Sequence, residues 1–548
     1  MSTIVAPSQR LCLTRPAIGS ATLSTVTALY LLLLSNQTFW SKGFADMADQ
    51  PLATGMLALG LAAIFIAACV TVSVKYATKP LFIGLILASA AGSWFMDHFG
   101  IIIDVEMIRN AAETTPAEAG HLMTPAFLLH MALYGVLPSV LISLVRIVHR
   151  PFLQKVKWNL AVILPCLIVF VAAGLSHAST YASVTREHRD WFATLNPFMP
   201  IASAVRYAIH RDAERNIVVQ PLGRDAHVAG LPAGSRKPRL TIIVAGETAR
   251  AENFSLNGYG RLTNPELAKR DITYFTDTRS CGTATAVSLP CMFSVYPKAA
   301  YSHAKGLDTE NLLDVLTHAG IKAEWWDNNT GSKQIANRVA QQSMPDTKDP
   351  RFCKDGECED GVLLDRLDAW MDKVDQDTVL VLHQIGSHGP AYYQRYPESF
   401  RTFTPDCRTA EFADCLQSEI VNAYDNTILY TDHVLATIID KLAARQDRLS
   451  PAMIYMSDHG ESLGEFGLYL HGAPYMIAPS QQTHVPFVLW QGQEEKRDMD
   501  QACLQAEAVK PTSHDNLFHT VLGMMHVETS VRDRALDLVS ACRTAAAS

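Results

Sequence analysis

The sequence predicts two parts of different fold class, an all-α membrane domain with five transmembrane helices followed by an α/β domain. Apolar residues make up 48% of the 548 residues, and almost all of their excess lies before residue 180. From residue 239 onward, apolar and β-branched runs alternate with segments of helical pattern. This alternation is typical of a mostly parallel sheet with helices on both faces.

Five apolar stretches are each about 20 residues long, enough to cross a hydrocarbon core about 30 Å thick. They cover residues 17–38, 53–74, 80–99, 125–148 and 160–178. The first could instead be a cleaved signal peptide, because Arg10 and Arg15 precede its apolar run. Four more spans follow and no small-residue cleavage site is evident, so we expect an uncleaved anchor.

The charges of the short loops orient these spans. One set of loops carries only Lys42 and Arg109 together with several acids, whereas the other set carries eight cations. Because cationic loops remain in the cytoplasm, five spans place everything after residue 180 in the periplasm of a bacterium. We therefore expect a multi-pass protein of the inner membrane. The eight cations are Arg10, Arg15, Lys75, Lys79, Arg146, Arg150, Lys155 and Lys157.

The cysteines point to the same compartment. Cys12, Cys69 and Cys166 lie in or before the membrane spans, and the other eight all follow residue 280. An oxidising compartment favours disulfides among these eight. A zinc cluster is the alternative, but no C-x-x-C pair supports it. The sequence leaves the connectivity open; we expect the close pairs Cys281/Cys291, Cys353/Cys358 and Cys407/Cys415, with Cys503/Cys542 by elimination.

Residues 181–238 form a transition between the two parts. Ile201, Val205 and Ile209 have helical spacing, which fits an amphipathic helix on the membrane surface and also an ordinary linker helix. We therefore expect a membrane domain over residues 1–180, an interfacial helix and linker over 181–238, and a catalytic domain over 239–548. The net charge of −8 and the lack of a basic stripe argue against a nucleic-acid partner.

Polar residues directly follow the predicted buried strands. The runs at residues 240–246, 378–386, 452–458 and 485–490 predict strands, and 310–319 and 422–444 predict helices. Glu247, His388 and Asp458 with His459 each come at or shortly after a strand end, where open α/β sheets place their sites. Glu, Asp and His are zinc ligands. For each residue, a cap or a loop contact to the backbone is the alternative, and this applies also to His471.

A hydroxyl-rich segment, "SCGTATAVSLPCMFS", offers a nucleophile. Its hydroxyls belong to Ser280, Thr283, Thr285 and Ser288. The run after Gly282 could open a helix, whose amino end attracts phosphate oxygens. A hydroxyl on a metal would also ionise more readily than a free one. The alternative is an ordinary helix cap, and the pattern does not choose among the four hydroxyls.

Together with this segment, "GETAR", "DNNTGSK", "SHGPAYYQRYP" and "YMSDHGESLGEFGLYLHGAPY" closely resemble the lipid A phosphoethanolamine transferases, a family that includes the mobile colistin-resistance enzymes. The resemblance spans the whole chain. It implies a periplasmic domain of the alkaline phosphatase/sulfatase fold after five membrane spans. It also implies zinc-dependent transfer of phosphoethanolamine from phosphatidylethanolamine to lipid A by a monomer that contacts membrane lipids.

The resemblance also assigns roles to single residues. It implies that Thr285 is the nucleophile, and that His388 and His471 move protons, contact substrate or hold a second zinc ion. The implied zinc ligands are Glu247, Thr285, Asp458 and His459. The implied headgroup contacts are Asn329 and Lys333, with Asn110, Thr114 and Glu118 from a periplasmic loop of the membrane part.

The implied mechanism has two steps through a phosphoethanolamine-threonine intermediate, with diacylglycerol leaving in the first. The added ammonium would reduce the negative charge that cationic polymyxins require, so resistance to polymyxin and colistin is expected.

Three other functions fit parts of the pattern. A sulfatase needs Cys or Ser followed by x-Pro-x-Arg, but Met292 stands where the Arg should be after Ser288 and Pro290. A transferase of phosphoethanolamine or phosphoglycerol to core sugars or periplasmic glucans would share the same site. A membrane sensor with an inactive hydrolase domain would lack a ligand or the nucleophile, and none is missing here.

Overall fold

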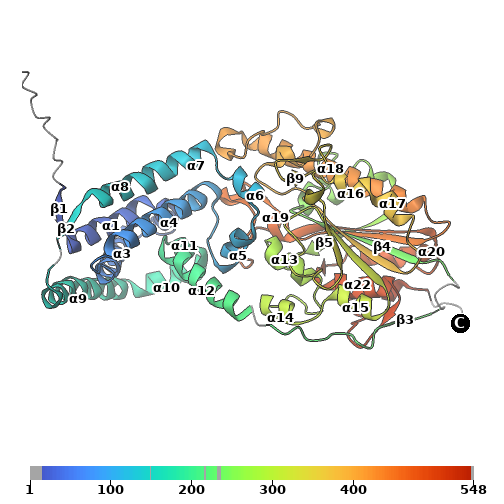
Figure 1. Cartoon of the computed structure of the whole chain (residues 1–548), viewed down its shortest axis with the longest axis horizontal. Coiled ribbons are helices and arrows are strands. Elements are labelled where there is room, and N and C mark those ends of the chain that lie inside the picture. The colour runs from blue at the N-terminus through green and yellow to red at the C-terminus, as the bar shows by residue number, and fades with distance from the viewer. Residues whose placement is uncertain (1–14, 149, 215–216, 231–235, 545–548) are drawn as a thin grey trace, which may run out of the picture. The chain divides into compact units, whose positions relative to one another are not determined.

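The computed structural model describes residues 15–148, 150–214, 217–230 and 236–544. Arg10 and Cys12 therefore lie outside the described residues. The chain divides into two compact units, one of Met1–His98 and Pro125–Ile201, the other of Phe99–Thr124 and Ala202–Ser548 (Figure 1). The loop between the third and fourth predicted spans thus belongs to the same unit as the α/β fold.

The first unit is helical. Four of its helical runs are long and apolar enough to cross a membrane: Pro51–Thr71 (α3), Thr78–Phe99 (α4), Pro125–Leu144 (α7, a π-helical turn and α8) and Phe152–Ser176 (α9). β1 (Ala17–Gly19) and β2 (Arg146–Val148) form a short parallel two-stranded sheet. The other helices are α1 (Ser20–Leu34), α2 (Gln37–Asp46), α10 (Ala178–Glu187), α11 (Arg189–Ala193) and α12 (Phe198–Glu214), which continues into the second unit.

The first predicted span differs from the structure. Residues 17–38 predict one membrane-crossing helix, but α1 has 15 residues and is therefore about 22 Å long. The side-chain amide of Asn36 donates hydrogen bonds to the carbonyl oxygens of Leu31 (2.9 Å) and Asn196 (2.7 Å). A polar residue thus ends this helix, and the chain restarts as α2. The described residues contain four full-length candidate spans and one shorter apolar helix.

The second unit is built on an eight-stranded sheet in the order β15-β5-β14-β11-β4-β10-β6-β7. Within the described residues only β14 runs antiparallel to both of its neighbours, so the prediction of a mostly parallel sheet is confirmed. The strands are β4 (Arg239–Gly246), β5 (Ile272–Arg279), β6 (Lys322–Asp327), β7 (Ala340–Ser343), β10 (Thr378–His383), β11 (Ser450–Ser457), β14 (His484–Gln491) and β15 (Thr512–Ser513).

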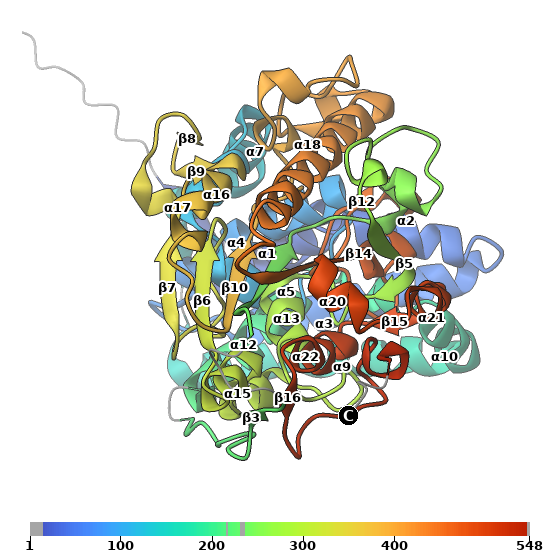
Figure 2. The same ribbon diagram turned by 90° about the vertical axis from the view of Figure 1, so that its right-hand side faces the viewer.

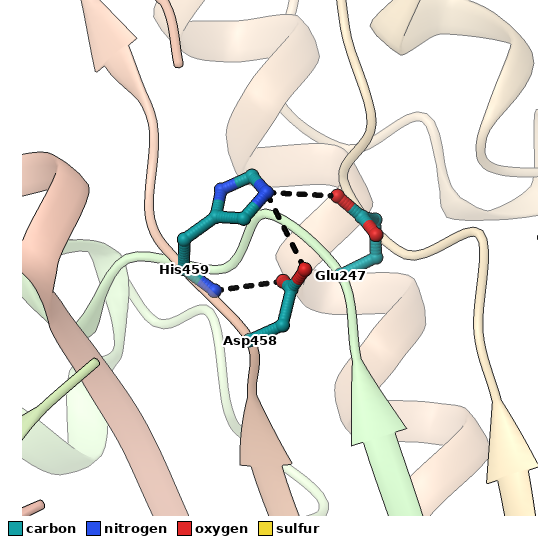
Figure 3. A group of neighbouring side chains, drawn as sticks. All are labelled: Glu247, Asp458 and His459. Atoms are coloured by element: carbon teal, nitrogen blue, oxygen red, sulfur yellow. Dashed lines mark hydrogen bonds and ion pairs between the residues drawn. The ribbon is translucent and has the colours of Figure 1, made fainter. Parts of the chain in front are cut away.

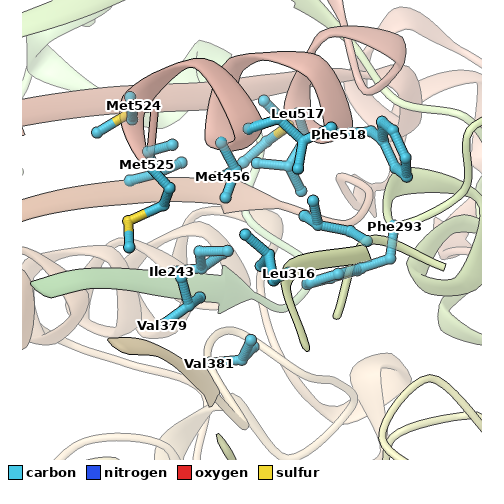
Figure 4. Packing of buried hydrophobic residues seen from close by; sticks show 14 of the residues in the cluster. Ile243, Phe293, Leu316, Val379, Val381, Met456, Leu517, Phe518, Met524 and Met525 are labelled. Atoms are coloured by element: carbon cyan, nitrogen blue, oxygen red, sulfur yellow. The ribbon is translucent and has the colours of Figure 1, made fainter. Parts of the chain in front are cut away.

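Helices cover both faces of this sheet. In two perpendicular views, α13 (Thr285–Met292), α15 (Leu312–His318) and α22 (Asp515–Met524) lie on one side, and α18 (Gln417–Ala443) lies on the other with α16 (Gly361–Asp365) and α17 (Leu367–Met371) (Figures 1 and 2). Ile243 and Val381 of the strands pack with Leu316, Leu517 and Phe518 of the helices (Figure 4). Because both faces are covered, the central strands are apolar along nearly their whole length rather than in alternation.

Strand register determines where the polar residues meet. Gly246 of β4 pairs with Ser457 of β11, and Ala245 of β4 pairs with His383 of β10. The residues that follow these strands therefore emerge at one edge of the sheet. This edge carries Glu247, Asp458 and the loops after β6 and β10.

The remaining elements surround this edge and the sheet. Two short helices are α5 (Val105–Glu113) and α6 (Pro116–His121). They are capped at their amino ends by Asp104 and Thr115, whose side chains accept hydrogen bonds from the amides of Met107 and Glu118. The others are α14 (His303–Asp308), α19 (Ser480–Thr483), α20 (Gln493–Arg497), α21 (Gln501–Glu507), β3 (His227–Val228), β8 (Cys353–Lys354), β9 (Glu357–Cys358), β12 (Ser462–Leu463), β13 (Tyr469–Leu470) and β16 (Val527–Glu528).

Four disulfides lie in the described part of the second unit. Each joins one of the pairs expected from the sequence, and one of them closes the β8–β9 hairpin. The pairs are Cys281–Cys291, Cys353–Cys358, Cys407–Cys415 and Cys503–Cys542. Cys69 and Cys166 of the first unit are free thiols.

Candidate active site

Glu247, Asp458 and His459 form a compact, buried group that could hold a metal ion (Figure 3). Their ligand atoms all lie within 4.8 Å of one another. His459 Nε2 is 3.3 Å from Glu247 Oε1 and 3.4 Å from Asp458 Oδ2. Among the described residues, Asp458 Oδ2 is buried without a hydrogen-bond partner. Buried polar atoms are seldom left unpaired, so this oxygen fits a metal ligand.

The electrostatics of this group also favour a cation. Burial opposes ionisation of Glu247, but the hydrogen bond and charge of His459 hold the pKa of Glu247 well below its usual range. Burial and the Glu247 carboxylate together raise the pKa of Asp458 to about 6. Burial disfavours an imidazolium, yet Asp458 and Glu247 raise the pKa of His459 to about 10. Two crowded carboxylates in a dry site thus attract positive charge.

Thr285 contacts this group directly. It is the first residue of α13, and its hydroxyl oxygen lies 3.1 Å from each carboxylate oxygen of Glu247 and 3.3 Å from His459 Nε2. The other three hydroxyls of the segment donate to backbone carbonyl oxygens instead: Ser280 to Gly282, Thr283 to Ala473, and Ser288 to Asp458. Of the four, only Thr285 contacts the side-chain ligand atoms of the metal-binding group.

A buried histidine that the sequence did not single out ties the Thr285 loop to the sheet. His514 Nδ1 accepts a hydrogen bond from the Cys281 amide (3.1 Å), and its Nε2–H donates to the Ser457 carbonyl oxygen (2.9 Å). Burial lowers the pKa of His514 to about 3, so the ring is neutral with its proton on Nε2. It holds the segment before Thr285 against the end of β11.

His388 and His471 extend from the metal-binding group in a row. The ring of His471 lies 4.5 Å from that of His459 and 5.4 Å from that of His388. His471 Nδ1 is 3.3 Å from the buried carboxylate of Glu461, and His388 Nε2 is 3.4 Å from Glu118 Oε1 on α6. Neither histidine belongs to the three-residue metal group, so both are placed to act beside it.

The loop after β6 carries two of the expected headgroup residues, and one of them, Asn329, contacts the metal-binding group. The side-chain amide of Asn329 donates to Glu247 Oε2 and to the Gln384 carbonyl oxygen, both at 2.8 Å. The ammonium of Lys333 lies 3.0 Å from Glu113 on α5, and the Lys333 side chain is 7% exposed. Asp327 orders this loop by accepting hydrogen bonds from the amides of Asn329 and Gly331.

One glycine in the loop after β10 has no substitute. Gly386 has a φ of +52°, and a Cβ there would lie 2.5 Å from the carbonyl oxygen of Glu247. The amide of Ser387 donates to that same oxygen at 3.0 Å. The close approach of Gly386 to the Glu247 backbone lets this loop fix the position of Glu247 and place His388 near the metal-binding group.

The periplasmic-loop residues divide into two sets. Glu118 lies 3.4 Å from His388. The Thr114 hydroxyl instead donates a hydrogen bond to the Asn110 carbonyl oxygen at 2.9 Å. In the described part of the chain, no hydrogen bond or ion pair joins Asn110 or Thr114 to the metal-binding group. Their neighbour Glu113 instead forms an ion pair with Lys333. Glu113 could not be singled out from the sequence, because its partner lies far along the chain.

A cavity of about 590 Å³ adjoins the metal-binding group. Glu118, Asn329, His388 and Glu357 are among its lining residues. Burial opposes ionisation of Glu357, but His121 and Arg395 hold the pKa of Glu357 well below its usual range. Arg395 bridges Glu357 (2.7 Å) to the His388 carbonyl oxygen (2.9 Å). Since Asn329 also contacts Glu247, the cavity and the metal-binding group share this residue as a neighbour.

The fold and the site define a class of protein, a membrane-bound enzyme with a sulfatase-like domain. Residues 239–527 match the sulfatase family, and residues 61–211 match the family described as phosphoethanolamine transferase EptA/EptB.

Relatives narrow the class to one family. The chain is 39% identical to phosphoethanolamine transferase EptA of Salmonella typhimurium, over 97% of this chain and 98% of that protein. It is 34% identical to phosphatidylethanolamine transferase Mcr-1 of Escherichia coli, over 95% and 97%. The integral membrane lipooligosaccharide phosphoethanolamine transferase A (EptA) of Neisseria meningitidis superposes with a TM-score of 0.93 at 35% identity, covering 97% of this chain and 100% of that one. The chain belongs to the phosphoethanolamine transferase family.

These findings confirm several expectations from the sequence. The second unit is a sulfatase-like α/β domain, and the chain is a phosphoethanolamine transferase. It is a multi-pass protein of the bacterial inner membrane, and its catalytic domain lies in the periplasm.

Proposed function

We propose that this enzyme transfers phosphoethanolamine from phosphatidylethanolamine to lipid A through a covalent intermediate on Thr285. One observation carries the proposal: the Thr285 hydroxyl lies within 3.1 Å of Glu247 and 3.3 Å of His459 at the amino end of α13. A hydroxyl held there is positioned both to lose its proton and to attack phosphorus. The name of Mcr-1 supports phosphatidylethanolamine as the donor.

Zinc is the metal we propose for the group. Two carboxylates, an imidazole and a hydroxyl are a donor set that Zn²⁺ accepts, and the unpaired Asp458 Oδ2 fits a ligand. The proposed ligands are Glu247, Asp458, His459 and Thr285. When bound, zinc would lower the pKa of the Thr285 hydroxyl and offset the negative charge of the phosphoryl oxygens. A second zinc ion near His388 and His471 would also offset the negative charge of the phosphoryl oxygens.

In the first step, the Thr285 hydroxyl gives its proton to the Glu247 carboxylate, to which it already donates a hydrogen bond. Thr285 Oγ1 forms a bond to the phosphorus of phosphatidylethanolamine, and the bond from phosphorus to the diacylglycerol oxygen breaks. His388 or His471 donates a proton to that oxygen, and neutral diacylglycerol leaves. In the second step, a phosphate oxygen of lipid A attacks the same phosphorus and passes its proton to the histidine. The bond to Thr285 Oγ1 breaks, and this oxygen takes back the proton from Glu247. Each step passes one group to one acceptor, so ping-pong kinetics are expected.

Residues that line the cavity or lie near it suit the donor headgroup. Lys333 would bind phosphate oxygens, and Asn329 would orient the phosphoryl group against Glu247. Glu118 would face the ethanolamine ammonium, with Asn110 and Thr114 as further contacts from α5 and the turn after it. Opposite charges at each end would orient the headgroup with phosphorus toward Thr285.

Lipid A is the acceptor we propose. Relatives named for lipooligosaccharide and for Kdo(2)-lipid A support an acceptor of this class. The product would carry one more ammonium, so the outer surface would attract cationic polymyxins less strongly. Resistance to colistin follows from this loss of charge.

The test is mass analysis of lipid A from cells that express the wild type, Thr285→Ala or Thr283→Ala. Thr283 is the matched control because its hydroxyl lies in the same segment but donates to Ala473. We expect added phosphoethanolamine with the wild type and Thr283→Ala, and none with Thr285→Ala. Unmodified lipid A in the wild type would reject the acceptor, and equal modification by Thr285→Ala would reject the nucleophile.

A further inference from the structure

The first unit contains a cationic cavity that the transfer reaction does not use. Its volume is about 510 Å³, and its lining includes Arg15, Lys75, Lys79 and Arg146. In the part of the chain that the structure describes, none of these four side chains forms an ion pair with a carboxylate. These residues belong to the loops that the charge pattern places in the cytoplasm, on the other side of the membrane from the catalytic domain.

Three separate segments build this cavity. The strand pair β1–β2 sets Ala17 beside Arg146, and the Arg146 amide donates to the Pro16 carbonyl oxygen at 2.9 Å, so Arg15 lies near Arg146. Lys75 belongs to the turn between α3 and α4. The Lys79 ammonium donates to the Ser143 carbonyl oxygen at 2.8 Å, which ties the start of α4 to the end of α8.

The charge of this region contrasts with the rest of the chain. The net charge of the whole chain is −8, yet residues 1–45, 50–96 and 119–186 contain no Asp or Glu at all. A preference for cations in cytoplasmic loops explains why the charges of these loops are positive. It does not require cations from three segments to converge on one cavity. Without an acidic partner, such a cavity attracts an anion from outside the chain.

We propose that this cavity binds the phosphodiester headgroup of an anionic phospholipid in the cytoplasmic leaflet. Basic pockets between helices on the cytoplasmic side suit such headgroups. The lining also includes Val145 and Ile147, which offer apolar surface for the glycerol and the start of the acyl chains. Tyr76 is 85% exposed at the rim, where aromatic side chains settle at the membrane interface.

The test is native mass spectrometry of the full-length protein in detergent, titrated with phosphatidylglycerol or, for comparison, phosphatidylcholine. Lys75→Gln/Arg146→Gln removes two charges from the cavity. The matched control, Arg150→Gln/Lys157→Gln, removes two charges from the same face but outside the cavity lining. We expect each lost cavity charge to weaken phosphatidylglycerol binding about fivefold. The control variant should bind like the wild type, and phosphatidylcholine should bind weakly to all three.

Two further experiments distinguish a lipid phosphate from free inorganic phosphate and control for misfolding of the variants. Millimolar inorganic phosphate should not displace the lipid, whereas displacement would make a free anion the ligand and overturn the lipid assignment. Lys75→Arg/Arg146→Lys keeps both charges and should restore binding; failure to do so would overturn the assignment to charge. Equal binding of phosphatidylglycerol by the cavity and control variants, or equal binding of both lipids by the wild type, would overturn the proposal itself.

Discussion

Each carboxylate oxygen of Glu247 lies 3.1 Å from the hydroxyl oxygen of Thr285, although the two residues are 38 positions apart. One follows β4 and the other begins α13. The sheet and the helix thus hold the proposed nucleophile against the metal-binding group before any substrate arrives.

This contact predicts a trapped intermediate. Purified enzyme incubated with phosphatidylethanolamine, but without acceptor, should accumulate phosphoethanolamine on Thr285, because the second step has no substrate. Fragmentation of the peptide by mass spectrometry would locate the added group. Thr283→Ala should still form the adduct and Thr285→Ala should not. An adduct on Thr283 or Ser288 in the wild type would contradict the assignment.

The metal-binding group predicts a difference between two histidines. His459→Ala removes a ligand atom from the group and should lose the tightly held metal, whereas His471→Ala should keep it, since His471 pairs with Glu461 instead. Metal content after chelation and readdition of zinc would measure this. Equal loss of metal by both variants would place His471 among the ligands.

The Glu113–Lys333 pair predicts a coupled effect on substrate use. Glu113→Gln should lower kcat/KM about fivefold, because a partly exposed ion pair contributes about 1 kcal/mol. The effect should vanish in a Lys333→Met background, since residues that act through one contact are not additive. Glu106→Gln removes an equal charge from the same helix without touching Lys333, so it serves as the control. Additive losses in the double variant would show that Glu113 acts independently of Lys333.

The two hydrogen bonds of His514 predict a loss of rate rather than of affinity. His514→Gln can keep the donor to Ser457, and His514→Asn can keep the acceptor for Cys281. Both should lower kcat with little change in KM or metal content, since His514 touches neither substrate nor the metal group. A change confined to KM would mean that His514 shapes the substrate cavity instead.

His514 also predicts how stability depends on pH. Burial lowers the pKa of His514 to about 3 in the folded protein, below its unfolded value of about 6.5. Its contribution is therefore complete above pH 6.5 and is lost as the pH falls, by about 2 kcal/mol at pH 5. The difference in Tm between the wild type and His514→Asn should narrow from pH 7.5 to 5. A constant difference would mean that the ring is not held neutral.

The sequence predicted the elements whose signals are local. Glu247, Asp458 and His459 were found because each directly follows a fully buried strand, and register then brings the strand ends together. Thr285 could not be chosen from four neighbouring hydroxyls by pattern, because the choice depends on a distance to β4. Glu113 and His514 were missed for the same reason, since their partners lie on distant segments.

Element ends were harder to predict than element types. The helix expected at 422–444 begins at Gln417, because the Glu419 carboxylate accepts the hydrogen bond of the Leu416 amide at 2.8 Å. Leu416 is an unusual residue before a helix. The first membrane span was predicted too long, because a run of apolar residues does not show that the Asn36 side chain bonds to the Leu31 carbonyl oxygen at the end of the helix.

The grouping of Phe99–Thr124 with the catalytic unit has a practical consequence for inhibitor discovery. A soluble fragment cut after the membrane helices would keep the metal-binding group but lack Glu113 and Glu118. Lys333 and His388 would lose their acidic neighbours, and one wall of the cavity would be missing. Compounds selected against such a fragment would be fitted to a surface that the cell never presents, so screening calls for the intact chain.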